Sequence, residues 1–264
     1  MNDAPHLTRL PPALYVVATP IGNLGDITLR ALDTLKAVAR VAAEDTRVSG
    51  QLLAHFGIAK PLVSVREHNE REAAAKVAGW IAAGEAVAYV TDAGTPAVSD
   101  PGARLVAALR DAGCVIVPIP GASAVVTALS AAGVAPGPWH FHGFLAPKSA
   151  ARQTELKALV ALPAALVFYE APHRIVETVA DLAAVFGGER RVTLARELTK
   201  KFESIHTLAL GEAVAWMQAD ANRERGEFVV VVHPPLTETT ATDAEALRVL
   251  GILAGELPPT LAAK

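Results

Sequence analysis

The chain has 264 residues, of which 52% are hydrophobic and 19% are charged, and its formal net charge is −3. This length suits two domains, and the apolar content is enough for a sizeable core in each. A negative charge balance argues against indiscriminate binding of nucleic acid, which needs Lys and Arg to neutralise phosphates, but it leaves room for a local basic patch. The single cysteine, Cys114, excludes an internal disulfide and lies in an apolar run where a buried thiol is expected.

Hydrophobic residues do not form long runs anywhere in the chain. No run approaches the roughly 18 apolar residues that a membrane span needs. The segment 1–12 also lacks the basic and then apolar pattern of a signal peptide. We therefore expect a cytoplasmic protein that does not associate with membranes.

The first half of the chain alternates short apolar runs with helical patterns. The apolar run 14–18 predicts a buried strand, and further strands are predicted at 86–91 and 114–119. Helices are predicted from about 29 to 38, with Asp26 or Thr28 as its cap, and at 48–56, 70–83 and 103–111. Such strand–helix–strand repeats predict a mostly parallel sheet covered on both faces, with ligands bound beyond the carboxyl ends of its strands. The loops 19–26, 92–101 and 120–123 leave strands at those ends, so we expect them to converge.

The pattern changes in the Pro- and Gly-rich stretch 134–138, where we place a domain boundary. The consecutive strands predicted near 192–210 require an antiparallel hairpin, so the second sheet is expected to be mixed. Its other strands are predicted at 139–144, 165–169 and 228–232, and helices at 150–160 and 175–186. The predicted organisation is an α/β domain at 1–136, a second α/β domain at 137–235, and a helical or flexible tail at 236–264, with one helix near 243–254.

Several common site signatures are absent from the sequence. There is no phosphate loop ending in Gly-Lys-Ser/Thr, and no Gly-x-Gly-x-x-Gly follows the first strand. The segment 121–125 approaches the Gly-x-Ser-x-Gly signature of serine nucleophiles but fails at its last position. His140 and His142 share a strand face without further clustered ligands, so no metal site is expected. Hydrolase, kinase and nicotinamide-dehydrogenase functions are disfavoured.

The loop 91–102 is the most informative stretch. It holds two Gly, two Pro and two Asp between a predicted strand and a predicted helix, more than a simple turn requires. Gly94 lets the backbone approach a ligand closely, while Pro96 and Pro101 fix the path of the chain. The alternative is an elaborate loop that only caps the following helix. The segment 120–123 opens the next helix, whose free backbone N–H groups suit a carboxylate.

Together with other blocks, these loops resemble the tetrapyrrole methylase superfamily, the class III S-adenosylmethionine (SAM) methyltransferases. The resemblance is strongest to the branch that methylates a cytidine 2′-hydroxyl of 16S rRNA in the small ribosomal subunit. The matching blocks are 14–28, 43–47, 67–70, 91–102, 118–123, 143–145, 169–174, 195–200 and 226–228, within a resemblance that runs from about 13 to 233. The chain departs from the family at Ala146, where proline is usual. It also ends soon after 257–259, where the family tends to continue with a basic helix, so the tail is either a natural variation or shortened.

The resemblance implies two α/β domains, the first with a mostly parallel and the second with a mixed sheet, and SAM bound in the cleft between them. It also implies a homodimer. The cofactor-binding residues that it implies are Pro20, Asp92, Gly94, Thr95, Val98, Ser123 and Ala124 in the first domain, and Tyr169, Glu170, Ala195 and Glu227 in the second.

Candidate catalytic residues are Asp45, Arg47 and His68. A histidine near neutrality can accept the proton of a ribose hydroxyl. The alternatives are that Asp45 and Arg47 form a helix-capping pair and that His68 only begins a helix. Candidate RNA-binding residues are Lys148, Arg152, Arg174, Lys200 and Lys201, and the last two can also be scattered surface charge. We expect Lys148, Arg152 and Arg174 to gather on one rim of the cleft.

Two other functions compete with RNA methylation. The first is methylation of a tetrapyrrole or another small molecule, because a fold alone does not fix a substrate. The blocks 44–47 and 169–174 favour the rRNA branch over that alternative. The second is a non-catalytic cofactor-binding module that serves in interaction, against which the intact Asp92, Pro96, Pro120 and Gly121 count.

Overall fold

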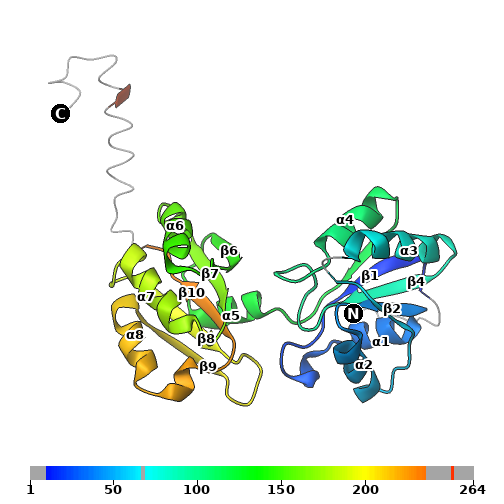
Figure 1. Cartoon of the computed structure of the whole chain (residues 1–264), viewed down its shortest axis with the longest axis horizontal. Helices are drawn as coiled ribbons and strands as arrows, with labels where there is room; N and C mark the ends of the chain where they lie inside the picture. Colours follow the sequence, from blue (N-terminus) through cyan, green and yellow to red (C-terminus); the bar gives the residue numbers. More distant parts are fainter. Residues whose placement is uncertain (1–9, 67–68, 236–250, 253–264) are drawn as a thin grey trace.

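The computed structural model describes residues 10–66, 69–235 and 251–252. It shows two α/β lobes, each built around its own five-stranded sheet (Figure 1). The predicted fold class, a mostly parallel sheet followed by a mixed one, is confirmed. Among the described residues, no helix is long and apolar enough to cross a membrane.

The first sheet is entirely parallel, in the order β3-β2-β4-β1-β5. Its strands are β1 (Ala13–Val17), β2 (Arg40–Ala43), β3 (Leu62–Ser64), β4 (Ala86–Val90) and β5 (Ile116–Ile119). The sequence pattern does not predict β2 and β3 as strands. They have four and three residues, too few to show a clear period.

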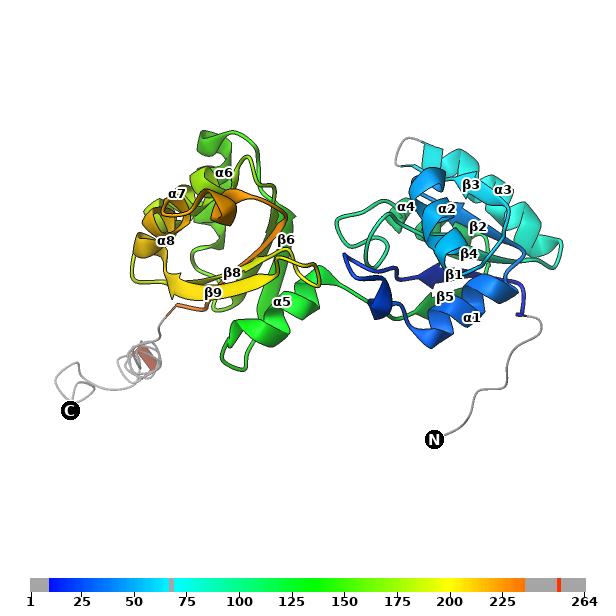
Figure 2. The same ribbon diagram turned by 90° about the horizontal axis from the view of Figure 1, so that it is seen from below.

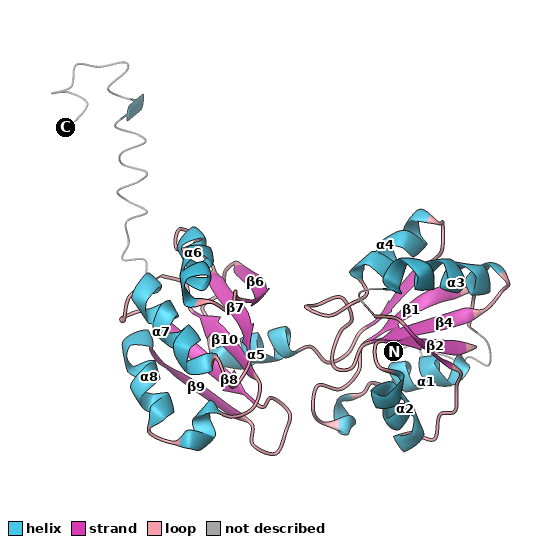
Figure 3. Ribbon diagram, in the orientation of Figure 1, coloured by secondary structure: helices cyan, strands magenta, loops and turns pink. Residues whose placement is uncertain are grey.

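Helices cover both faces of the first sheet, as the strand–helix repeats predict (Figure 3). They are α1 (Leu29–Ala37), α2 (Thr46–His55), α3 (Glu70–Ala82) and α4 (Ala103–Asp111). Tyr15 and Val17 of β1 pack in the core under α1 and α2, whereas Leu14 faces α3 and α4. This alternation follows from the two-residue period of a strand. Cys114 is half-buried and packs against the core that lies between the sheet and the helices α3 and α4.

The second sheet is mixed, in the order β6-β7-β10-β8-β9. Its strands are β6 (Trp139–Phe144), β7 (Ala165–Glu170), β8 (Arg191–Arg196), β9 (Ser204–Ala209) and β10 (Phe228–Val232). β6 and β7 are parallel, whereas β8 and β9 form the predicted antiparallel hairpin. Two short 3-10 helices, η1 (Leu24–Asp26) and η3 (Ala221–Glu224), lie in loops of the first and second lobe.

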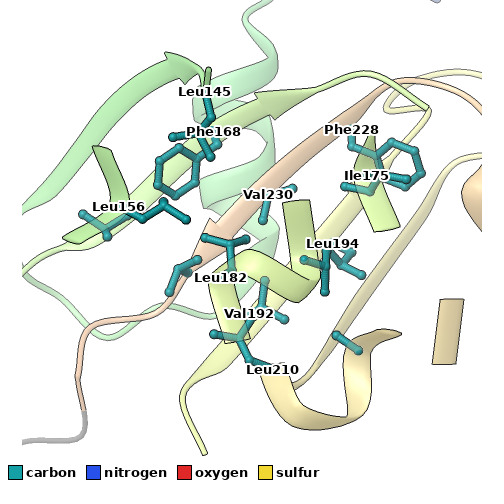
Figure 4. Packing of buried hydrophobic residues seen from close by; sticks show 14 of the residues in the cluster. Leu145, Leu156, Phe168, Ile175, Leu182, Val192, Leu194, Leu210, Phe228 and Val230 are labelled. Atoms are coloured by element: carbon teal, nitrogen blue, oxygen red, sulfur yellow. The ribbon is translucent and has the colours of Figure 1, made fainter. Parts of the chain in front are cut away.

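The core of the second lobe lies between its sheet and the helices α6 (Ser149–Leu159), α7 (Ile175–Phe186) and α8 (Leu210–Gln218). Figure 4 shows Leu156, Phe168, Leu182 and Val230 meeting in this core. The helix α5 (Ala124–Ala132) covers the other face of the same sheet, through Val125, Ala128 and Ala132. α5 precedes the predicted boundary at 136/137 but packs on the second sheet.

The chain passes from the first lobe to the second through the short loop 120–123, between β5 and α5 (Figures 1 and 2). All strands of the first sheet precede this loop, and all strands of the second follow it. The two lobes are therefore joined by one covalent connection within the described residues.

Candidate functional site

Loops at the carboxyl ends of the first sheet meet at one place, as predicted. Thr19 and Gly94 exchange backbone hydrogen bonds, with N···O distances of 2.9 and 3.1 Å. The Thr95 hydroxyl donates to the backbone oxygen of Ala122 over 3.0 Å. The loop after β4 is thereby tied both to the loop after β1 and to the connection between the lobes.

A cavity of about 320 Å³ opens beside these loops and is lined by both lobes. All the predicted cofactor-binding residues except Pro20 and Asp92 line it: Gly94, Thr95, Val98, Ser123, Ala124, Tyr169, Glu170, Ala195 and Glu227. Pro20 and Asp92 line a neighbouring hollow against α2. The structure thus gathers in one cleft residues that are far apart in the sequence, while their individual roles stay predictions.

The backbone beside the cavity is suited to close approach of a ligand. Gly94 has a φ of +80°, which side-chain-bearing residues rarely adopt, and a β-carbon added there would lie 3.1 Å from Ile21 Cγ2. Ser123 precedes α5 without capping it through its side chain, and Ser123 and Ala124 both line the cavity. The N-terminal N–H groups of α5 are therefore placed to receive an anionic group such as a carboxylate.

Most charged groups of the cavity wall are paired. The Lys200 ammonium lies 2.6 Å from Glu227 Oε2 and 2.9 Å from Glu197 Oε1. Glu170 is buried; it accepts hydrogen bonds from the Thr178 hydroxyl and from a backbone N–H, and lies 3.3 Å from Arg174 Nε. These contacts fix the second-lobe wall.

Asp100 lines the same cavity and was not singled out by the analysis of the sequence. Burial and the negative charges of Glu44 and Asp92 raise the pKa of its carboxyl to about 6, although the Thr91 hydroxyl lowers it in part. The composition of the loop 91–102 shows two Asp residues but not which of them faces the cleft. Only the folded path of the loop shows this.

The candidate catalytic pair near β2 forms a helix cap. Asp45 precedes α2, accepts a hydrogen bond from the Arg47 backbone N–H over 2.8 Å, and lies 2.6 Å from the Arg47 guanidinium. Hydrogen bonds from Arg47 hold the pKa of the Asp45 carboxyl well below its usual range, so it is a weak proton acceptor. The capping interpretation therefore accounts for this pair. His68 lies outside the described residues.

The candidate RNA-binding residues do not all lie on one rim. Lys148 and Lys201 are exposed. The expectation for Arg152 is wrong, because this residue is fully buried and its Nε lies 2.6 Å from the Asp181 carboxylate. Arg174 is mostly buried and donates to the backbone oxygens of Leu145 and Ala146, at 2.7 and 3.1 Å. It holds the turn at 145–146 in place.

The loops of a parallel sheet and the face of a mixed sheet enclose a cavity between two α/β lobes, which defines a two-domain α/β fold with a candidate ligand site at the domain boundary. A family model described as "Tetrapyrrole (Corrin/Porphyrin) Methylases" matches residues 13–214, and the chain belongs to this family. The methyl donor of the family is SAM. The residues of the cavity fit this cofactor, because Gly94 leaves room for close approach and the N-terminus of α5 suits its carboxylate.

Curated relatives match nearly the whole chain. The "Ribosomal RNA small subunit methyltransferase I" of Pseudomonas aeruginosa is 51% identical over 248 residues, covering 93% of this chain and 88% of the relative. The protein of the same name from Escherichia coli O157:H7 is 48% identical, covering 93% and 86%.

Solved structures share the fold at lower identity. Uroporphyrin-III-C-methyltransferase from Thermus thermophilus superposes with a TM-score of 0.59 at 22% identity, covering 83% of this chain and 93% of that one. Cobalt precorrin-4 methyltransferase gives a TM-score of 0.63 at 18% identity, covering 84% and 95%. These structures support the two-domain fold.

Proposed function

We propose that this chain is a SAM-dependent methyltransferase that methylates the 2′-hydroxyl of a cytidine in 16S rRNA of the small ribosomal subunit. The observation that carries the proposal is the 51% identity, over 93% of the chain, to a relative named as a small-subunit rRNA methyltransferase. The cytidine and the 2′-oxygen come from the resemblance of the sequence blocks to the rRNA branch of the family.

The cofactor would be held in the cavity between the lobes. Gly94, Thr95 and Val98 would contact it from the loop after β4, the N-terminus of α5 would receive its carboxylate, and Tyr169 and Ala195 would form the opposite wall. When bound, SAM supplies an electrophilic methyl group. The protein then contributes alignment of donor and acceptor in a cleft that restricts water, an effect worth up to roughly 7–11 kcal/mol in favourable cases.

The RNA would contact the exposed cations beside the cleft. Lys148 and Lys201 are accessible for this, and the Arg47 guanidinium is also exposed at the N-terminus of α2. Arg174 and Lys200 would act differently, since both are engaged in contacts within the protein: Arg174 positions the turn at 145–146, and Lys200 holds the cavity wall.

The test is methylation of small subunits by the purified protein. Subunits from a strain that lacks the corresponding gene are incubated with protein and labelled SAM, and the rRNA is digested to nucleosides for mass spectrometry. The expected product is 2′-O-methylcytidine. Label on a base, or on no nucleoside, contradicts the proposal.

The same assay addresses the alternative substrates. Uroporphyrinogen III is added in place of the subunits, because the family model and the structural neighbours are named for tetrapyrrole methylation. Label transferred to it, with none on rRNA, would favour the small-molecule function. Binding of SAM without transfer to either substrate would favour the non-catalytic module.

A further inference from the structure

Among the described residues, one charged side chain that lines the cavity between the lobes has no counter-ion. Its charged lining residues are Asp100, Glu170, Lys200 and Glu227. Glu170 pairs with Arg174, and Glu227 pairs with Lys200. Asp100 takes part in no ion pair with any residue that the structure describes.

The side chains around Asp100 add negative charge rather than neutralising it. Glu44, beyond β2, and Asp92, beyond β4, both act electrostatically on the Asp100 carboxyl. The nearby cations Arg66 and Arg47 interact with Glu44 and Asp92 respectively, and neither forms an ion pair with Asp100. On the second lobe the facing titratable group is Tyr169, whose pKa is raised to about 12 by burial and then by the charge of Asp100.

Two buried hydroxyls of the first lobe, those of Thr91 and Tyr89, have no hydrogen-bond partner within the described chain. The Thr91 hydroxyl is buried and close enough to lower the Asp100 pKa, yet it completes no hydrogen bond of normal geometry within the described chain. The Tyr89 hydroxyl is fully buried and equally without a partner. The carboxylate of Glu70, whose charge also raises the pKa of Tyr89, already accepts hydrogen bonds from the backbone N–H groups of Gly102 and Leu105. Asp100, which lines the cavity, and the carboxylates of Glu44 and Asp92 that act on it therefore favour an occupant that brings positive charge.

We infer that the Asp100 carboxylate makes the cavity selective for a cationic occupant over a neutral one of the same shape. The inference rests on the proposed function in one respect, that SAM is the cofactor. SAM carries a sulfonium charge, whereas S-adenosylhomocysteine (SAH), the product left after methyl transfer, has a neutral thioether. Asp100 therefore favours binding of the donor and weakens retention of the product.

Binding of a cation beside Asp100 should release a proton at mildly acidic pH. With a pKa of about 6, Asp100 is charged at neutral pH and becomes protonated as the pH falls below that value. A cation bound nearby favours the ionised form and lowers this pKa, so binding near pH 6 releases a proton. A neutral ligand of the same shape does not.

The test is calorimetry on the full chain at pH 7.5, with SAM and SAH as separate ligands and with Asp100→Asn as the variant. The expected result is that the variant weakens binding of SAM on the order of tenfold and changes binding of SAH less than about twofold. The matched control is Asp111→Asn, which removes the same charge from an exposed position on α4 and should change neither affinity. Equal effects of Asp100→Asn on both ligands, or no effect on either, overturn the inference.

A second measurement uses the wild-type protein alone, so it does not depend on the folding of a variant. SAM is titrated at pH 6 in buffers of different ionisation enthalpy, which reports the protons released. Release with SAM but not with SAH is expected, and equal release or none with both contradicts the inference. Absence of binding of either ligand overturns the cofactor assignment together with this inference. Failure of rRNA methylation with selective SAM binding overturns only the proposed substrate.

Discussion

Arg152 and Asp181 form an ion pair inside the second lobe, where α6 packs on α7. Asp181 also accepts hydrogen bonds from the Ser149 hydroxyl, at 2.9 Å, and from the Gln153 amide, at 2.7 Å. The sequence contains a signal for this burial. Arg152 is four residues from Leu156 and seven from Leu159, so all three lie on one face of the helix, and both leucines are in the core. Residue type alone predicted an exposed cation, because arginine is rarely buried unless it is paired and the partner lies 29 positions away.

Replacing Arg152 by alanine should therefore destabilise the fold rather than weaken an RNA contact. Breaking a buried pair leaves Asp181 charged and without its partner, which costs about 3–5 kcal/mol. Urea unfolding measures this loss, and Lys157→Ala, an exposed cation on the same helix, should stay within about 0.5 kcal/mol of the wild type. A stable Arg152→Ala protein with reduced affinity for RNA would restore the phosphate-binding role.

Replacing Asp100 should raise the stability of the protein, whereas replacing Arg152 should lower it. When the pKa of an acid is higher in the folded protein than in the unfolded protein, ionisation of that acid opposes folding. The stabilisation that protonated Asp100 gives the fold is complete below about pH 4 and is lost as the pH rises through about 6. Asp100→Asn should thus stabilise the ligand-free protein by about 1 kcal/mol at pH 7.5, after solvent screening, and by little at pH 4.5. Thermal unfolding at the two pH values checks this, and a variant that is less stable at pH 7.5 would contradict it.

At the scale of secondary structure, α5 connects the two lobes. Its N-terminus lies at the cavity beside the first sheet, while its body covers a face of the second sheet. The sequence predicts that the loops after parallel strands converge, because that follows from strand direction alone. It does not predict which sheet α5 covers, since the apolar positions Val125, Ala128 and Ala132 define a buried face without naming the surface that buries it.

Gly94 is the position in these loops where a side chain should be least tolerated. Gly94→Val places a branched side chain at a φ of +80° and against Ile21, on the wall of the cavity. The expected result is loss of measurable SAM and SAH binding in calorimetry. The control is Gly79→Ala on α3, where an added β-carbon meets nothing within 4 Å and the helix should gain about 0.5–1 kcal/mol. Normal ligand binding by Gly94→Val would mean that the ligand lies elsewhere.

At the scale of the whole molecule, apolar surface remains on the second lobe. Trp139, on β6, is 50% exposed, and Phe202, beyond β8, is 62% exposed. Phe141, on the same strand, is partly buried: it packs edge-on against Tyr169, with ring centroids 5.0 Å apart, and lies against the core under α5. Trp139 and Phe141 are two residues apart on a regular stretch of β6 and share a face of the sheet, and Trp139 differs in being the first residue of the strand.

We expect the protein to form a homodimer, as the family resemblance implies, and exposed apolar side chains such as Trp139 are consistent with a covered face. Light scattering should give twice the chain mass of 27.5 kDa. Trp139→Glu tests whether this side chain takes part, and a shift toward the monomer is expected. A monomer mass for the wild type across micromolar concentrations would contradict the prediction.

The single connection at 120–123 also limits how one lobe can move relative to the other. Pro120 holds its own φ nearly fixed, so any rotation of one lobe relative to the other uses the ψ of Pro120 and the torsion angles of the few residues that follow it. The two lobes also touch beside this connection, because Ile21 and Val98 of the first lobe pack against the core that α5 covers on the second sheet. Gly121 itself is crowded, because a β-carbon added there would lie 2.9 Å from the β-carbon of Ala18. Any change in the width of the cleft would therefore act on this short, crowded connection and on the packing of Ile21 and Val98.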